Sequence, residues 1–342
     1  MDTYEPTKDE IEKWRELNPR DSFSMMDSQV VERLRKERGL PGAAAEQGIG
    51  KAIGNAESDD KDDDDDIEGF KIPIRSKRGP VWEKSEDNPH KTVAPDQGFL
   101  LAEVDLTPPE EAVNMLAKLF PRLNTNNWEQ ALKAGLAPAV RACRTLEIDE
   151  ERLIVFPWIK RKSLARLSKL KEETHYGALV KKVVFPRLAR LYKERNLGFT
   201  NYRARKMSAD GYLRMGERTA DWVSRSEESV EEGDICFSAV ILDLFHGYSV
   251  KATRYETERE QSLINGTCYV LQQLLLTQIQ LQTKWEELHW WMPGDKYDPN
   301  GQARFPSSLY CFVFGNDFWF DNSYIANSNT PCGSAVFPSE LL

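Results

Sequence analysis

The charged residues of this chain are sorted into blocks of opposite sign, and these blocks limit which parts can fold alone. Residues 1–70 hold 20 Asp and Glu against 10 Lys and Arg, including an unbroken aspartate run at 62–66. Residues 158–206 hold 15 Lys and Arg against 3 Glu, although the formal net charge of the chain is −9. A patch of like charge repels itself and is stabilised by binding a partner of opposite sign. The pattern therefore indicates binding more strongly than any reaction.

The aromatic residues place the folded core in the later part of the chain. Eight of the nine Trp residues lie beyond residue 80, and 40% of all residues are hydrophobic, which is enough for a packed core. Low hydrophobicity combined with high charge predicts disorder, because such a segment cannot offset the entropy lost on folding. We therefore expect short amphipathic helices over 1–41, a disordered acidic linker over 42–98 and one folded domain over 99–342.

The N-terminal arm carries a narrow apolar stripe of a kind that binds a partner. Phe23, Met26, Val30 and Leu34 follow each other at spacings of three and four residues, which places them on one face of a helix. A stripe this narrow cannot bury a core alone, and an isolated short helix is marginal in water. The stripe is predicted either to bind in a groove of a protein partner or to pack on the folded domain of this chain.

The folded domain is predicted to be mainly α-helical with a minor β element, an α+β arrangement. Thr107 followed by two prolines and two glutamates is typical of a helix start, with Thr107 as the cap. The apolar segment 235–250 fits a buried helix or a strand equally well. The aromatic-rich last forty residues predict short strands. Further helices are expected over 127–136, 138–147, 160–172, 186–196 and 262–291.

The expected helix over 262–291 has two interpretations. Its apolar residues follow heptad-like steps, and Gln278 is the one polar member of the series, as in a coiled coil whose register a glutamine sets. Self-association through 262–291 is one interpretation. A neighbouring second row of apolar residues widens the stripe, which favours simple burial in the core. The heptad series consists of Leu271, Leu274, Leu281, Trp285 and Leu288.

The basic block predicts a surface that binds nucleic acid. Lys and Arg neutralise phosphates and release condensed counterions, and interleaved aromatic residues can stack on unpaired bases. RNA is therefore favoured over base-specific reading of duplex DNA, and an acidic protein remains the alternative ligand. The candidate binding residues are Lys160, Arg161, Lys162, Arg166, Lys169, Arg187, Arg190, Lys193, Tyr202, Arg203, Arg205 and Lys206.

Other roles for the basic block are possible. The cations can solvate helix faces, or they can pair with acidic residues elsewhere in the fold. The runs 160–162 and 203–206 also fit a nuclear-import signal. If the block is a binding surface, the aspartate run is expected to compete with nucleic acid for it.

Two Glu-x-x-His tetrads suggest an alternative function, a metal-dependent enzyme. The pairs Glu172–His175 and Glu286–His289 would each share one helix face, as in carboxylate di-metal sites of helix bundles. Such a site needs two further carboxylates, for which Glu147 or Glu150 and Glu256 or Glu258 are available. Tetrads of this kind also arise by chance in a Glu-rich chain, so the spacing alone does not establish a metal site.

The remaining features favour a binding protein inside the cell. The sequence contains no phosphate-binding glycine loop, dinucleotide fingerprint or nucleophile elbow, so no cofactor and no catalytic residue is predicted. Five scattered cysteines without a Cys-x-x-Cys favour reduced thiols, and the acidic N-terminus does not resemble a secretory signal. We therefore expect a cytoplasmic or nuclear location and no membrane association.

The order of these parts resembles that of the phosphoproteins of negative-strand RNA viruses. An acidic, helix-forming arm, a flexible linker and a compact basic domain follow one another in both. The resemblance implies an adaptor whose arm holds a nucleoprotein or polymerase and whose folded part engages a nucleocapsid. It is a resemblance of organisation that assigns no role to any residue. A structural or assembly protein is the third function class.

Overall fold

The computed structural model describes residues 67, 69–76, 82–92, 104–201, 206–278, 289–314, 317–327 and 332–339. Every described residue lies within residues 61–342. The predicted partner-binding stripe (Phe23, Met26, Val30 and Leu34) and the aspartate run 62–66 therefore lie outside the described residues.

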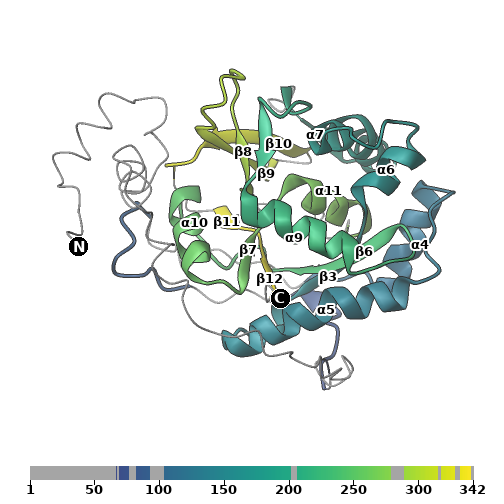
Figure 1. Cartoon of the computed structure of the whole chain (residues 1–342), viewed down its shortest axis with the longest axis horizontal. Helices are drawn as coiled ribbons and strands as arrows, with labels where there is room; N and C mark the ends of the chain where they lie inside the picture. Colours follow the sequence, from purple (N-terminus) through teal and green to yellow (C-terminus); the bar gives the residue numbers. More distant parts are fainter. Residues whose placement is uncertain are drawn as a thin grey trace, which may run out of the picture. The chain divides into compact units, whose positions relative to one another are not determined.

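Helices and strands are interspersed along the described chain up to α11, and strands β8 to β12 follow it (Figure 1). The helical elements are α4 (Pro109–Leu119), α5 (Trp128–Thr145), η3 (Glu150–Arg152), α6 (Arg161–Leu167), α7 (Tyr176–Leu179), η4 (Val180–Val184), α8 (Phe185–Lys193), α9 (Glu217–Glu228), α10 (Val250–Arg259) and α11 (Cys268–Thr277). The strands are β1 (Arg75–Ser76), β2 (Val104–Asp105), β3 (Ile154–Ile159), β4 (Gly198–Thr200), β5 (Leu213–Met215), β6 (Ile235–Val240), β7 (Leu263–Asn265), β8 (His289–Tyr297), β9 (Ser307–Phe314), β10 (Asp317–Tyr324), β11 (Cys332–Ser334) and β12 (Val336–Pro338).

The prediction of a mainly α-helical domain is wrong. Helix accounts for 40% and strand for 23% of the interpretable residues, so both kinds of element build the fold. The largest sheet has six strands, in the order β11-β8-β9-β10-β4, and β5 pairs with β8 off this path. The error arose mainly at 262–291, where the heptad-like spacing predicted one helix. The structure instead has β7, then α11, and then β8 from His289 onward.

Strands β3 and β6 form an antiparallel pair that is covered on both faces. All six residues of each strand are buried, as their nearly continuous apolar sequences require. Helix α5 packs against β6, whereas α4 and α11 pack against β3. The approach of α5 is close: a Cβ added to Gly135 would lie 2.2 Å from the carbonyl oxygen of Phe237. Segment 235–250, ambiguous in the sequence, therefore begins with a buried strand.

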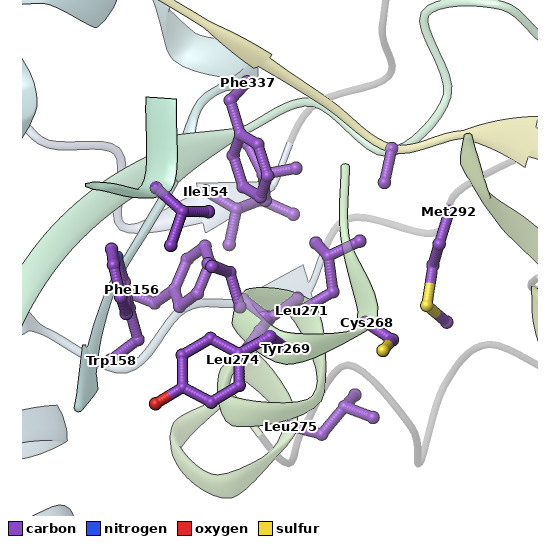
Figure 2. Close-up of a cluster of buried hydrophobic side chains, with 14 of the residues drawn as sticks. Ile154, Phe156, Trp158, Cys268, Tyr269, Leu271, Leu274, Leu275, Met292 and Phe337 are labelled. Carbon is purple, nitrogen blue, oxygen red and sulfur yellow. The ribbon is translucent and has the colours of Figure 1, made fainter. Parts of the chain in front are cut away.

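Helix α11 lies at the centre of the hydrophobic core (Figure 2). Each of its ten residues is buried, which agrees with the core interpretation of this segment rather than with an exposed coiled-coil seam. Figure 2 shows the side chains of β3 on one side of α11 and Met292 of β8 near Cys268. Helix α8 packs against the six-stranded sheet, where the Phe185 ring lies 4.9 Å from the Phe320 ring.

Polar side chains of α11 satisfy backbone groups that β3 does not use in its pairing with β6. Gln273 Oε1 accepts a hydrogen bond from the Ile159 amide at 2.8 Å, and the Tyr269 hydroxyl donates to the Ile159 carbonyl at 2.7 Å. Gln278 Oε1 accepts from the Thr107 amide at 2.8 Å, and its Nε2 donates to the carbonyls of Thr107 and Val155. Gln278 therefore fixes the start of α4 and β3 and does not set the register of a coiled coil.

Replacing Gln278 by Leu is expected to lower the free energy of unfolding by about 1–3 kcal/mol, since the buried Thr107 amide and two carbonyls lose their partner. Chemical denaturation of the variant and of the wild-type protein measures this difference. A stability change within about 0.5 kcal/mol, as for an ordinary surface substitution, would contradict the structural role of Gln278.

Two predicted helix boundaries need correction. Thr107 does not cap α4 with its side chain, because its hydroxyl donates to the Thr277 carbonyl at 2.7 Å and Pro108 is the N-terminal cap residue. The expected break between 127–136 and 138–147 does not occur, since α5 continues through Pro138. The predicted helices near 109 and 186 are present as α4 and α8.

Residues 82–92 pack against α10, although this stretch lies inside the range predicted to be a linker. Glu256, 2% exposed, accepts hydrogen bonds from the Ser85 amide at 3.1 Å, the Ser85 hydroxyl at 2.5 Å and the Asn88 amide group at 2.6 Å. The Tyr248 hydroxyl donates to the Trp82 carbonyl at 2.6 Å. A buried carboxylate with three donors is well compensated, so these contacts hold the segment on the fold.

Asp295 in β8 joins three elements through one buried carboxylate. Its oxygens accept hydrogen bonds from the Tyr176 hydroxyl at 3.1 Å, the Thr267 hydroxyl at 2.9 Å and the Cys268 amide at 2.5 Å. The side chain is completely buried. Burial raises the pKa of Asp295 to about 6, although the donated hydrogen bonds lower it. Asp295 thereby ties β8 to α7 and to the first turn of α11.

The raised pKa of Asp295 predicts a pH-dependent stability. The unfolded carboxyl titrates near 3.8, so the folded protein binds this proton more tightly. The stability contributed by the protonated carboxyl is complete below about pH 4 and is lost as the pH rises through about 6, a change on the order of 3 kcal/mol. Asn at this position cannot titrate.

We therefore expect the stability of Asp295→Asn, relative to the wild-type protein, to increase between pH 4 and pH 7. Denaturant titrations of both proteins across this range test the expectation. A stability difference that stays constant with pH would contradict a raised pKa at Asp295.

Candidate nucleic-acid interface

The first cations of the basic block serve the fold. Arg161, at the start of α6, makes an ion pair with Glu227 of α9 at 2.7 Å, and the two side chains are only 31% and 15% exposed. The Lys160 ammonium donates a hydrogen bond to the Val230 carbonyl. Arg166 pairs with the buried carboxylate of Asp234 at 2.6 Å, although its own side chain is 56% exposed. Lys160 and Arg161 therefore hold α6 on the fold, and Arg166 does so in part.

Helix α6 is shorter than predicted. It ends at Leu167, and Lys169 adopts a left-handed conformation with φ of 55°. The Leu170 amide donates to the Ala165 carbonyl across this turn, which closes the helix. Residues 168–172 therefore lie outside the helix. Lys162 and Lys169 remain exposed at the two ends of this unit.

The second basic unit belongs to a continuous helical segment, 176–193, made of α7, η4 and α8. Its middle, Val180–Val184, is a π-helical turn, in which the Phe185 amide donates to the Val180 carbonyl. Pro186 follows at once and has no amide to donate. The wider turn thus lets the helix continue past a residue that would otherwise interrupt its hydrogen bonding.

Arg187 is turned toward the fold. Its guanidinium lies 4.1 Å from the centre of the Phe120 ring, and it donates hydrogen bonds to the carbonyls of Leu119 and Val183. Burial lowers the pKa of Arg187. This side chain connects α8 to the end of α4, so we do not include it in the interface.

The solvent face of segment 176–193 carries the exposed cations. Lys182, Arg190 and Lys193 follow one another at helical spacing and are all exposed. Arg190 makes an ion pair with Glu194 at 2.9 Å, but its side chain is 82% exposed. Such an exposed pair contributes little free energy, so a phosphate can replace the Glu194 carboxylate. We call Lys182, Arg190 and Lys193 the helical basic face.

The described aromatic residues of the block pack against the core. Tyr192 is completely buried, and the Phe199 ring stacks on the Phe318 ring at 5.8 Å. Phe199 is partly buried, and one face of its ring is covered by Phe318. Tyr202, Arg203 and Arg205 lie outside the described residues. Lys206 is exposed and lies 5.4 Å from the centre of the Tyr212 ring.

Three further cations, on β5, on β8 and in the loop after β8, were not predicted from the sequence. Arg214 in β5 and Lys296 in β8 are partners across two antiparallel strands. Arg304 is exposed in the loop between β8 and β9. These residues are isolated charges in the sequence, and the pairing of β5 with β8 brings Arg214 and Lys296 together. No charge count over a short window could have found them.

The helical geometry required by the metal hypothesis is not found. Glu172 is exposed in the turn between α6 and α7, and His175 caps α7 by accepting a hydrogen bond from the Gly177 amide at 3.1 Å. His289 begins a strand, and Glu286 lies outside the described residues. Within the ranges that the structure describes, no group of three His, Cys, Asp or Glu residues could hold a metal ion.

The described cysteines are structural. Cys143, Cys236, Cys268 and Cys311 are buried and form no disulfide with one another. Burial raises the pKa of Cys268 well above its ordinary value, and the Asp295 carboxylate raises it further. A neutral, buried thiol is a poor nucleophile, so the position of Cys268 at the start of α11 does not indicate catalysis.

Comparisons with protein-family models, curated proteins and solved structures return no match for this chain. Among the described helices, none combines the length and the apolar character needed to cross a membrane.

Proposed function

We propose that this protein binds nucleic acid through phosphate contacts made by the helical basic face. The observation that supports the proposal is the position of Lys182, Arg190 and Lys193, exposed together on one side of segment 176–193. Lys162 and Lys169 are exposed on the neighbouring α6 unit, and α6 packs against α7. Cations arranged in this way attract a polyanion whatever its base sequence.

RNA remains the first ligand to test, and phosphate contacts rather than base stacking are the proposed basis of binding. Tyr192 is completely buried and Phe199 packs on Phe318, so the proposal does not rely on stacking of these two rings on bases. Binding through the helical basic face is therefore expected to depend on phosphate density and salt rather than on base identity. An acidic protein is the competing ligand for the same charges.

The proposed role is that of an adaptor. The folded part contacts nucleic acid, and the apolar stripe within residues 1–41 binds a protein partner. The acidic residues of 1–70 compete with nucleic acid for the basic side chains. Deleting 1–70 is then expected to tighten RNA binding at low salt. An unchanged affinity would contradict the competition, although not nucleic-acid binding by the folded part.

Purification of the full chain from its native source, with and without nuclease, tests the proposal. Nucleic acid that copurifies, and that is released by nuclease or by high salt, is the expected result. A preparation free of nucleic acid, with an acidic protein that stays bound after nuclease treatment, would contradict it.

A further inference from the structure

The junction of β5 and β8 places two cations directly opposite each other. Arg214 and Lys296 are partners in the antiparallel register, so their side chains leave the same face of the sheet. Their neighbours Leu213, Asp295 and Tyr297 are buried on the other face. Like charges in opposed positions of a strand pair destabilise the sheet unless something of opposite charge lies between them.

Aromatic rings and the adjoining loop hold this group of cations in place. The Arg214 guanidinium lies 4.2 Å from the centre of the Phe305 ring, and Arg304 is the next residue back in the same loop. Lys206 lies over Tyr212, whose carbonyl accepts a hydrogen bond from the Asp298 amide at 2.8 Å. Arg214 and Lys296 are thus opposed on one face of the sheet, and Lys206 and Arg304 lie in the loops next to this junction.

The loop that carries Arg304 and Phe305 has a strained but well-supported backbone. Ala303 and Phe305 both have positive φ, at 56° and 46°, in the region that non-glycine residues avoid. Asp298, 1% exposed, holds the loop by accepting hydrogen bonds from the amides of Asn300 and Arg304 at 2.9 Å each. Strain of this kind persists where the surroundings fix the backbone, and it concentrates at binding sites.

Two acidic groups lie near Lys296 without forming an ion pair with it. Glu217 and Glu258 are the carboxylates whose charges act on Lys296, and Arg254 is a further cation beside it. Burial, Arg254 and Arg214 together lower the pKa of Lys296, against the opposing effect of the two glutamates. No ion pair within the described part of the chain involves the side chains of Lys206, Arg214, Lys296 or Arg304.

We propose that Lys206, Arg214, Lys296 and Arg304 form a phosphate-binding site at the β5–β8 junction. The guanidinium of Arg214 can bind two phosphate oxygens side by side, and Lys296 supplies a second positive charge from the opposite strand. The phosphate can belong to a free nucleotide or to the backbone of a nucleic acid. This site does not depend on the helical basic face, so each can fail without the other.

Calorimetric titration of the full chain with inorganic pyrophosphate tests the site. The double variant Arg214→Gln, Lys296→Gln is expected to bind pyrophosphate at least about tenfold more weakly, because two charge-assisted contacts are lost. The control variant Lys118→Gln, Arg122→Gln removes the same charge from another exposed region and should bind as the wild-type protein does. Failure of the wild-type protein to bind pyrophosphate, or equal binding by the double variant, would overturn the proposal.

Two further measurements complete the test. Lys296→Gln alone is expected to keep or raise the melting temperature without phosphate, since it removes the repulsion from Arg214, and a lowered melting temperature would count against the opposed-charge argument. Titration with a mononucleotide and with a short oligouridylate distinguishes the two phosphate sources. The ligand that binds more tightly of the two identifies the phosphate source, and loss of its binding in the double variant supports the site. If the wild-type protein binds neither ligand, the proposal is overturned.

Discussion

The triple variant Lys182→Gln, Arg190→Gln, Lys193→Gln is expected to bind single-stranded RNA about 100-fold more weakly than the wild-type protein at about 0.1 M salt. Each cation that neutralises a phosphate contributes about 0.7 to the slope of log affinity against log salt for a single strand, so three contacts contribute about 2. The affinity difference follows from that slope. Filter binding or fluorescence anisotropy over a range of salt concentrations measures both quantities.

The control for this experiment is a second triple variant, Lys91→Gln, Lys118→Gln, Arg122→Gln. Its three residues are exposed, and it removes the same charge from elsewhere on the described chain. If binding depends only on the net charge of the protein, the two variants will lose affinity equally. Equal losses, or an unchanged salt slope in the first variant, would show that the helical basic face does not contact RNA.

Asp295→Ala is expected to lower the free energy of unfolding by about 3–5 kcal/mol, the largest stability effect predicted for this protein. The substitution leaves the Tyr176 hydroxyl, the Thr267 hydroxyl and the Cys268 amide buried without their acceptor. Chemical denaturation followed by circular dichroism measures the loss. Asp221→Ala, which removes an exposed carboxylate from a pair with Arg225, is the matched control and should change stability by less than about 0.5 kcal/mol. A loss of stability at Asp295 as small as that of the control would contradict its role as the acceptor for three buried donors.

Local signals predicted several elements correctly. The prolines after Thr107 marked the start of α4, and the helix expected over 186–196 is present as α8, with Pro186 in its first turn. The aromatic composition of the last forty residues predicted strands, and β9 to β12 are found there. These signals succeed because proline geometry and β-favouring side chains act over a few residues.

Long-range pairing explains what the sequence could not show. The heptad-like spacing across 262–291 does not reveal that Gln278 bonds to Thr107, 171 positions away. The sequence predicts that the basic block forms one surface. In the structure, however, Arg161 pairs with Glu227, 66 positions away, and Arg166 pairs with Asp234, 68 positions away. The cations at the β5–β8 junction come from strands that are distant in the sequence. In each case the fold decides which charges remain available for a ligand.

Photocrosslinking of the full chain to an oligoribonucleotide that carries 4-thiouridine tests the central claim most directly. The protein is irradiated at low salt, digested and analysed by mass spectrometry to locate the modified peptides. We expect adducts on peptides from residues 160–195, and we expect the Gln variant of the helical basic face to lose them. Adducts confined to other parts of the chain, or no adducts where the RNA is demonstrably bound, would contradict nucleic-acid binding by this face.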